Sequence, residues 1–221
     1  MKIIGHRGAK GLAPENTLRA FNKALQHHVD AVEFDLRVTK DSIVVLHHDS
    51  YLTDQEGQQL LLCEHSLQEL QDHKPDLLSL HEFAKQFGTK VHLYIEIKPD
   101  ERVQPIARAL QYQLDHGWKP SDFSITSFDQ KILVAMHRLF PAVEIIVLER
   151  WSGVRATFRA RQVGTKRLAM NQKWLWVGFL ASMQRAGYQI SPYTMNDPTK
   201  AHKWQRYLYG VITDYPNLYD K

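Results

Sequence analysis

Three acidic residues stand inside otherwise apolar runs, which is an unusual place for a carboxylate. Glu33 and Asp35 lie in the run AVEFDL, and Glu96 lies in LYIEIK. If these runs are strands, Glu33 and Asp35 point to the same face, roughly 6.6 Å apart along the strand. Carboxylates buried without a partner are costly, so they require a cation. Because Cys63 is the only cysteine, the set favours Mg²⁺ or Ca²⁺ over zinc.

Basic side chains next to these carboxylates allow two interpretations. Arg7 and Lys98 have the chemistry of phosphate clamps, since both donate hydrogen bonds from a positive charge. Alternatively, Arg7, Arg37 or Lys98 neutralises the carboxylates in ordinary salt bridges, and no metal is needed. The residue spacing leaves both interpretations open.

Histidines offer general acid and base chemistry at two places. His6 follows the apolar run Lys2 to Gly5, while His47 and His48 end the run Ser42 to His48. If the second run is extended, His47 and His48 point to opposite faces, so only one of them faces a substrate. A single histidine is more often structural than catalytic, and the chain has 12 of them.

The elements that must position these residues alternate between short β-branched runs and amphipathic helical stretches. This pattern predicts a parallel sheet covered by helices. Helices are expected over Pro14 to His28, with proline at the first helical position, and over Gln172 to Ala186, with Trp176, Phe179, Leu180 and Met183 as a core stripe. The eight expected strands are Lys2 to Gly5, Ala31 to Val38, Val91 to Ile97, Phe123 to Thr126, Val143 to Leu148, Arg167 to Met170, Gln189 to Thr194 and Gly210 to Thr213.

Eight such units favour a closed (β/α)8 barrel, with an open doubly wound sheet as the alternative. In a barrel the polar residues at the carboxyl ends of the strands form the active site, which is where these acidic and histidine residues fall. The run Ser42 to His48 is expected to form a β-ribbon or an extension at the rim of the barrel. A phosphate-binding loop and a G-x-S-x-G elbow are both missing, which disfavours nucleotide phosphoryl transfer and serine hydrolysis.

Composition predicts one globular domain, with 43% hydrophobic residues. We expect a cytoplasmic protein without a transmembrane segment, since no apolar leader opens the sequence.

The net charge is +4, and the segment from Arg150 to Lys173 holds seven Lys or Arg and no acidic residue. An anionic small molecule is the expected partner, although a membrane or nucleic acid would also be attracted. Specific nucleic-acid binding is not expected, and the oligomeric state stays open.

The order of motifs along the chain resembles the glycerophosphodiester phosphodiesterase family. The motifs are His6-Arg7-Gly8, Ala13-Pro14-Glu15-Asn16-Thr17, Val32-Glu33-Phe34-Asp35, Lys40-Asp41, His48-Asp49, Ile95-Glu96-Ile97-Lys98, Thr126-Ser127-Phe128, Tyr193-Thr194-Met195-Asn196-Asp197 and Thr213-Asp214-Tyr215-Pro216. The resemblance spans nearly the whole chain. It implies a single TIM-barrel domain over residues 1–221 with a short insertion at about 42–79, and metal-dependent hydrolysis of glycerophosphodiesters to an alcohol and sn-glycerol 3-phosphate, in glycerol and lipid metabolism.

The same resemblance implies a role for each site residue. Glu33, Asp35 and Glu96 would bind the divalent metal, His6 and His48 would be the acid and base, and Arg7, Lys98 and Tyr193 would contact the substrate. His48 is preferred to His47 because, like the family's catalytic histidine, it directly precedes an aspartate.

Two departures from the family pattern concern the substrate. Tyr193 stands where many members have tryptophan, and Tyr51-Leu52-Thr53-Asp54 replaces the usual Arg-Thr-Thr. The alternatives are a lysophospholipase D-type enzyme that contacts a membrane through Trp174, Trp176 and the basic segment, and a non-catalytic barrel that binds phospholipid or RNA.

Overall fold

Eight strands form a parallel, nearly closed barrel in the computed structural model, which describes residues 1–54 and 56–220. Around the barrel the strands follow the order β10, β9, β8, β7, β6, β2, β1, β11. β10 and β11 lie in contact and bring the two ends of this order together, and just after β10 the N–H of Met195 donates to Ile212 O at 2.8 Å. Their bounds are β1 Lys2–Gly5, β2 Ala31–Val38, β6 His92–Ile97, β7 Phe123–Ser127, β8 Glu144–Glu149, β9 Arg167–Asn171, β10 Gln189–Tyr193 and β11 Gly210–Thr213. The predicted barrel is confirmed, and the open sheet is rejected.

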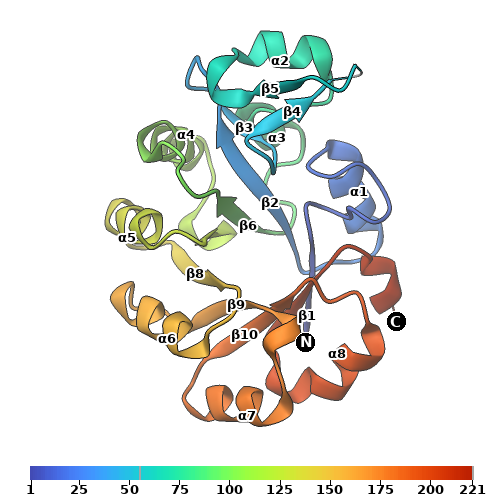
Figure 1. The fold of residues 1–221 in the computed structure, drawn as a ribbon, viewed down its shortest axis with the longest axis vertical. Helices are drawn as coiled ribbons and strands as arrows, with labels where there is room; N and C mark the ends of the chain where they lie inside the picture. Colours follow the sequence, from blue (N-terminus) through green and yellow to red (C-terminus); the bar gives the residue numbers. More distant parts are fainter. Residues whose placement is uncertain (55, 221) are drawn as a thin grey trace.

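Helices surround the barrel, as Figure 1 shows in a view with the strands at the centre. They are α1 Leu18–Gln26, α3 Leu80–Gln86, α4 Val103–Asp115, α5 Gln130–Leu139, α6 Gly153–Gln162, α7 Val177–Arg185 and α8 Pro198–Trp204. Each helix runs back from the carboxyl end of one strand to the start of the next. The first turns of these helices therefore lie at the carboxyl ends of the strands.

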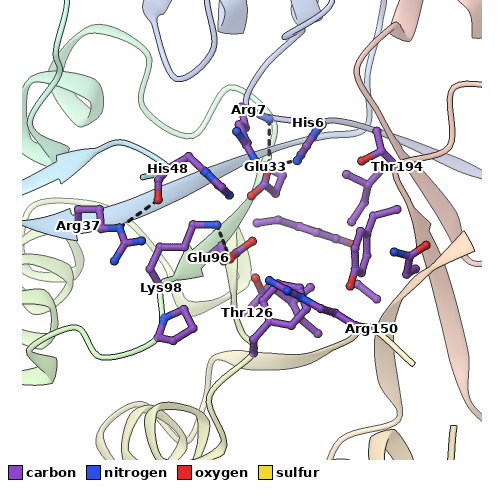
Figure 2. A pocket seen from close by; sticks show the side chains of 18 of the residues that line it. His6, Arg7, Glu33, Arg37, His48, Glu96, Lys98, Thr126, Arg150 and Thr194 are labelled. Carbon is purple, nitrogen blue, oxygen red and sulfur yellow. Dashed lines mark hydrogen bonds and ion pairs between the residues drawn. The ribbon is translucent and has the colours of Figure 1, made fainter. Parts of the chain in front are cut away.

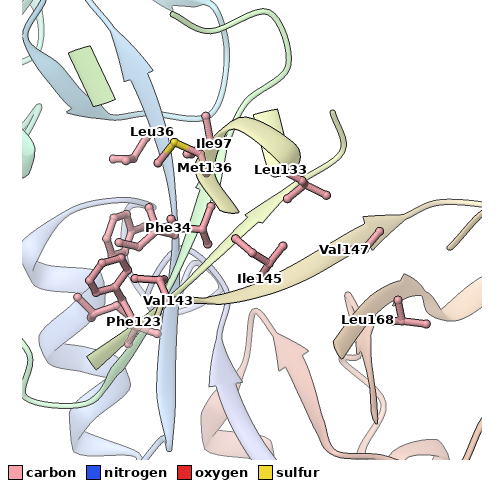
Figure 3. Close-up of a cluster of buried hydrophobic side chains, with 14 of the residues drawn as sticks. Phe34, Leu36, Ile97, Phe123, Leu133, Met136, Val143, Ile145, Val147 and Leu168 are labelled. Atoms are coloured by element: carbon pink, nitrogen blue, oxygen red, sulfur yellow. The ribbon is translucent and has the colours of Figure 1, made fainter. Parts of the chain in front are cut away.

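Residue alternation along the strands separates two hydrophobic layers. Phe34 and Leu36 of β2, like Ile145 and Val147 of β8, face outward and pack in the main core (Figure 3). Ile146 and Leu148 of β8 face inward and belong to a smaller cluster inside the barrel. In β2 the inward-facing alternates are Glu33 and Asp35, so the same alternation that builds the core delivers carboxylates to the interior.

A small layer follows β2 and lies at the top of Figure 1. The strand β3, Val44–Leu46, pairs antiparallel with β2, so the expected ribbon is present. Beyond it come the hairpin of β4, Tyr51–Thr53, and β5, Gln59–Leu61, and then the helix α2, Leu67–His73. Val45 packs with leucines of the hairpin and of α2 in a separate cluster.

The first helix begins later than we expected. Pro14 is not its first residue, because α1 starts at Leu18 with Thr17 as its N-cap. The Thr17 side chain accepts a hydrogen bond from Ala20 N and donates one to Pro14 O. Residues 14–16 form a turn in which Asn16 has a φ of 57°. This turn brings Glu15 and Asn16 to the site described below.

The expected helix over Gln172 to Ala186 is also divided. A 3-10 turn covers Gln172–Trp174, and α7 begins at Val177 with Trp176 as its N-cap. Leu180 and Met183 of the predicted stripe are buried, but Trp176 is 64% exposed and does not belong to the core. The periodicity was therefore correct only for the part of the stripe within α7.

Candidate active site

Carboxylates from two neighbouring strands meet inside the barrel. Glu33 and Asp35 on β2 and Glu96 on β6 are all buried, and one oxygen from each lies within 4.8 Å of the others. The register of the two parallel strands places Asp35 directly beside Glu96. Two separate parts of the sequence thus contribute to one acidic cluster (Figure 2).

The loop after β1 folds back over this cluster. Arg7 and Gly8 both have left-handed backbone conformations, with φ of 50° and 84°. In this turn the backbone N–H of Arg7 donates to Glu33 Oε2 at 2.9 Å, and that of Gly8 donates to Glu33 O at 3.2 Å. The turn fixes the direction of β1 relative to β2 and places His6 3.9 Å from Glu33.

Lys98 and Arg7 neutralise two of the three carboxylates. Lys98 Nζ lies 2.7 Å from Asp35 Oδ1 and 2.5 Å from Glu96 Oε1. Arg7 Nε lies 3.2 Å from Asp35 Oδ2, and its Nη1 donates to Glu15 at 2.8 Å. The salt bridges that we considered as an alternative are therefore present for Asp35 and Glu96.

The remaining candidate partner, Arg37, contacts other groups. It pairs with Glu101 at 3.0 Å and donates to the His48 carbonyl at 3.0 Å. Arg37 lies on the same wall as His48, and no ion pair joins it to the acidic cluster in residues 1–54 and 56–220.

Glu33 has less positive charge near it than the other two carboxylates. Burial, together with the charges of Asp35 and Glu96, raises the pKa of Glu33 to about 7, although His6 and Arg7 act in the opposite direction. Burial also raises the pKa of Asp35, but Lys98 and Arg7 outweigh it and hold that pKa well below its usual range. Within the described part of the chain, Glu33 Oε1 has no hydrogen-bond partner.

These features fit a hard divalent cation. The three carboxylates present oxygen ligands at short mutual distance, and one buried oxygen is still without a partner. A cation held by Glu33, Asp35 and Glu96 would supply the missing positive charge, and Mg²⁺ and Ca²⁺ both prefer such oxygen ligands. The acidic cluster is thus able to hold a metal even though Lys98 already contacts it.

His6 is oriented by a carboxylate from the far end of the chain. Its Nδ1 lies 2.6 Å from Asp214 Oδ1, and Asp214 Oδ2 in turn accepts from Asn196 Nδ2 at 2.8 Å. Burial lowers the pKa of His6, but the hydrogen bond with Asp214 and the charge of Glu33 outweigh it, so the pKa is raised.

His48 has a different environment. Its Nδ1 lies 2.8 Å from Asp49 Oδ1, and burial together with the charge of Lys98 lowers its pKa. The structure places His48 in the wall of the cavity. His47 is instead turned toward the hairpin, where its Nε2 lies 3.0 Å from Tyr51 O.

An open cavity of about 780 Å³ is lined by His6, Arg7, Glu33, Arg37, His48, Glu96 and Lys98, whereas Asp35 and His47 do not line it. Figure 2 shows His6, Glu33 and His48 grouped at one side, with Arg150 across the cavity. Tyr193 also lies on that opposite wall, where its hydroxyl donates to Glu149 O at 3.1 Å and its ring contacts Phe128 edge to face. The wall that faces the acidic cluster is therefore aromatic and cationic.

Sequence reasoning did not assign roles to four residues that support the site. Asp214 and Asn196 hold His6, Glu15 binds Arg7, and Asn16 Nδ2 donates to Asp35 Oδ2 at 2.9 Å. All four belong to motifs of the family pattern, which was the available signal. Their partners lie on other strands or loops, so spacing along the chain did not reveal the contacts.

Comparisons with known proteins point to one enzyme family. The model of the "Glycerophosphoryl diester phosphodiesterase family" matches residues 6–218. The glycerophosphodiester phosphodiesterase of Bacillus subtilis is 26% identical, over 99% of this chain and 85% of its own length. That of Bacillus altitudinis is 24% identical, over 98% of this chain and 95% of its own.

Solved structures show the same barrel. An Oleispira antarctica phosphodiesterase in complex with the product sn-glycerol-3-phosphate superposes with a TM-score of 0.87, at 26% identity, over 99% of this chain and 94% of that one. The glycerophosphodiester phosphodiesterase of Thermotoga maritima gives a TM-score of 0.82 at 26% identity, over 99% and 96% of the two chains.

Proposed function

This chain belongs to the glycerophosphoryl diester phosphodiesterase family, and from that premise we propose that it hydrolyses glycerophosphodiesters to an alcohol and sn-glycerol 3-phosphate with a divalent metal and two histidines. One observation carries the proposal: the buried cluster of Glu33, Asp35 and Glu96 shares a cavity with both His6 and His48. The product bound to the Oleispira antarctica relative supports the same reaction.

The acidic cluster would hold the metal, and the residues around it would hold the phosphate. Bound Mg²⁺ or Ca²⁺ supplies Lewis-acid stabilisation of charge on the phosphate oxygens. Arg7 and Lys98 would place two further positive charges beside the phosphate. The carboxylates that they bind already orient both side chains before a substrate arrives. Such preorganised charges stabilise the transition state because they need no rearrangement during the reaction.

The two histidines would move the protons. His6 has a raised pKa, so it is the better proton donor to the leaving alkoxide. His48 has a lowered pKa, so it is the better acceptor of the proton from the attacking oxygen, whether that belongs to water or to the glycerol 2-hydroxyl. Asp214 keeps the Nε2 of His6 directed at the cavity by binding its Nδ1.

The direct test is to incubate the purified protein with glycerophosphocholine, glycerophosphoethanolamine and a lysophospholipid, each with Mg²⁺, Ca²⁺ or EDTA. We expect release of sn-glycerol 3-phosphate from the first two substrates, and loss of that release in EDTA, because the site requires a cation. Glu96→Gln should raise the metal concentration needed for half-maximal activity, since it removes an anionic ligand. Full activity after exhaustive chelation, with no metal detected in the protein, would refute the metal-dependent mechanism.

A further inference from the structure

Exposed apolar side chains gather on one side of the cavity mouth. We call them the aromatic rim: Trp151 (60% exposed), Val154 (82%), Phe158 (61%), Trp174 (56%), Trp176 (64%) and Val177 (38%). The four aromatic members expose on the order of 400 Å², since each has roughly 200 Å² of surface and is more than half exposed. A patch of that size on a monomer commonly marks an interaction site.

The aromatic rim is built from two adjacent loops and the first two turns of the helices that follow them. One loop joins β8 to α6 and the other joins β9 to α7, and β8 pairs with β9. The two segments touch, because the ring of Phe179 lies so close to Gly153 that a Cβ there would be 2.4 Å from it. Figure 1 shows α6 and α7 side by side.

This position puts the aromatic rim at the entrance to the active site. Both loops leave the carboxyl ends of their strands, where the cavity opens, and Trp151 itself lines the cavity. A surface that covers the rim would therefore face the mouth of the site. Such a surface would have to leave the cavity accessible to substrate.

The two chain segments that carry the aromatic rim hold only positive charges. From Arg150 to Asn196 the sequence holds eight Lys or Arg and no Asp or Glu. Arg150, Arg155 and Lys173 belong to the two rim segments, while Lys166 and Arg167 lie toward the opposite end of the barrel. The last carboxylate before these segments in the sequence, Glu149, is fully buried and already bound by Arg155 through two contacts of 2.7 Å.

We propose that the aromatic rim binds the surface of an anionic phospholipid bilayer, with the cavity mouth directed at that surface. Tryptophan and phenylalanine enter the interface between headgroups and acyl chains, and adjacent Lys and Arg are attracted to anionic lipids. A second copy of this chain fits less well, because a symmetric dimer would place two positive surfaces against each other. If the proposed function holds, this orientation gives the enzyme access to glycerophosphodiester groups at a membrane, such as those of lysophospholipids.

The test measures binding without turnover. Wild type is sedimented with vesicles of equal parts phosphatidylglycerol and phosphatidylcholine, and with vesicles of phosphatidylcholine alone, at low and high salt. The variant Phe158→Ser/Trp174→Ser/Trp176→Ser removes three members of the aromatic rim that do not line the cavity. A matched control, Tyr112→Ser/Leu139→Ser, removes exposed apolar side chains from the last turns of α4 and α5, at the opposite end of the barrel.

We expect wild type and the control to bind anionic vesicles, with binding weakened by salt, and the rim variant to bind at least about tenfold less. Equal binding by the two variants, or no binding by wild type, would overturn the proposal. So would a stable dimer of wild type in light scattering that the rim variant abolishes, because the rim would then bind another copy. Hydrolysis of soluble glycerophosphocholine checks that the variants are folded, and its absence in wild type would count against the proposed function without affecting the binding result.

Discussion

At the scale of single residues, the adjacent His47 and His48 are separated by the direction of their side chains. His48 lines the cavity, whereas His47 contacts the Tyr51 carbonyl in the hairpin. His48→Ala should lose at least about two orders of magnitude in kcat, the lower end for a positioned acid or base. His47→Ala should lose little, since that ring does not line the cavity.

Steady-state kinetics of the two variants, with folding checked by circular dichroism, decides this assignment. An inactive His47→Ala beside an active His48→Ala would mean that the functional side chain lies on the other face of this segment.

Asp214 is a positioning residue for His6. Asp214→Asn weakens the contact that orients the ring, so kcat should fall at least about tenfold. It also removes the charge that helps to raise the pKa of His6. A His6 that must donate a proton would then lose it at lower pH, and the alkaline limb of the kcat profile should move to lower pH.

A double-mutant cycle gives the control for Asp214. If Asp214 acts through His6, Asp214→Asn should cost little more in a His6→Ala background, because groups that act together have non-additive effects. Additive losses from the two changes would show that Asp214 acts independently of His6.

At the scale of elements, the loop from β1 to α1 has to pass very close to the helix it enters. A Cβ on Gly8 would lie 2.7 Å from the Ala20 carbonyl carbon in α1, at a φ of +84°. Gly8→Ala therefore combines a clash with backbone strain, each worth about 1 to 3 kcal/mol. We expect a total loss of about 3 kcal/mol in the free energy of unfolding, and lower activity because His6 and Arg7 shift.

Gly57 offers a matched control for backbone strain alone. Its φ is +85°, but a Cβ there would meet nothing within 4 Å. Gly57→Ala should therefore cost only about 1 kcal/mol, the effect of the left-handed conformation. Urea denaturation of both variants measures the difference, and equal losses would show that contact with α1 is not important.

At the scale of the whole molecule, the buried Glu33 carboxylate lowers stability at neutral pH when no metal is bound. The pKa of Glu33 in the folded protein is about 7, above its ordinary value of 4.5. The folded state therefore binds more protons than the unfolded state between these values, so this group lowers stability as pH rises through that window. A metal bound at this site would relieve the effect, because it would favour the ionised carboxylate.

Glu33→Gln should reveal this cost, since glutamine does not ionise. In EDTA, the free energy of unfolding of the variant relative to wild type should rise between pH 5 and pH 8 by up to about 3 kcal/mol. With Mg²⁺ or Ca²⁺ the order should reverse, because wild type gains more from metal binding. Thermal or urea unfolding at several pH values tests both parts, and a pH-independent difference in EDTA would contradict the raised pKa.

The sequence by itself determined the features that depend on local pattern. Alternation in AVEFDL placed Glu33 and Asp35 on one face, and all eight predicted barrel strands agree with the structure to within one residue at each end. The periodic spacing of apolar residues in a strand or helix shows which side chains face the core. This spacing involves only residues that are close in sequence, so the sequence alone reveals it. The motif order was specific enough to indicate the family, which the comparisons confirm.

Only the tertiary structure decided how the pieces meet. Lys98 lies between Asp35 and Glu96 because of the register of β2 and β6, and Asp214 reaches His6 across 208 positions of sequence. The start of α1 at Leu18 and the exposure of Trp176 also depend on contacts that local propensity does not contain. A sequence pattern specifies the direction of a side chain along its own element, but the partner that it meets depends on the packing of elements far apart in the chain.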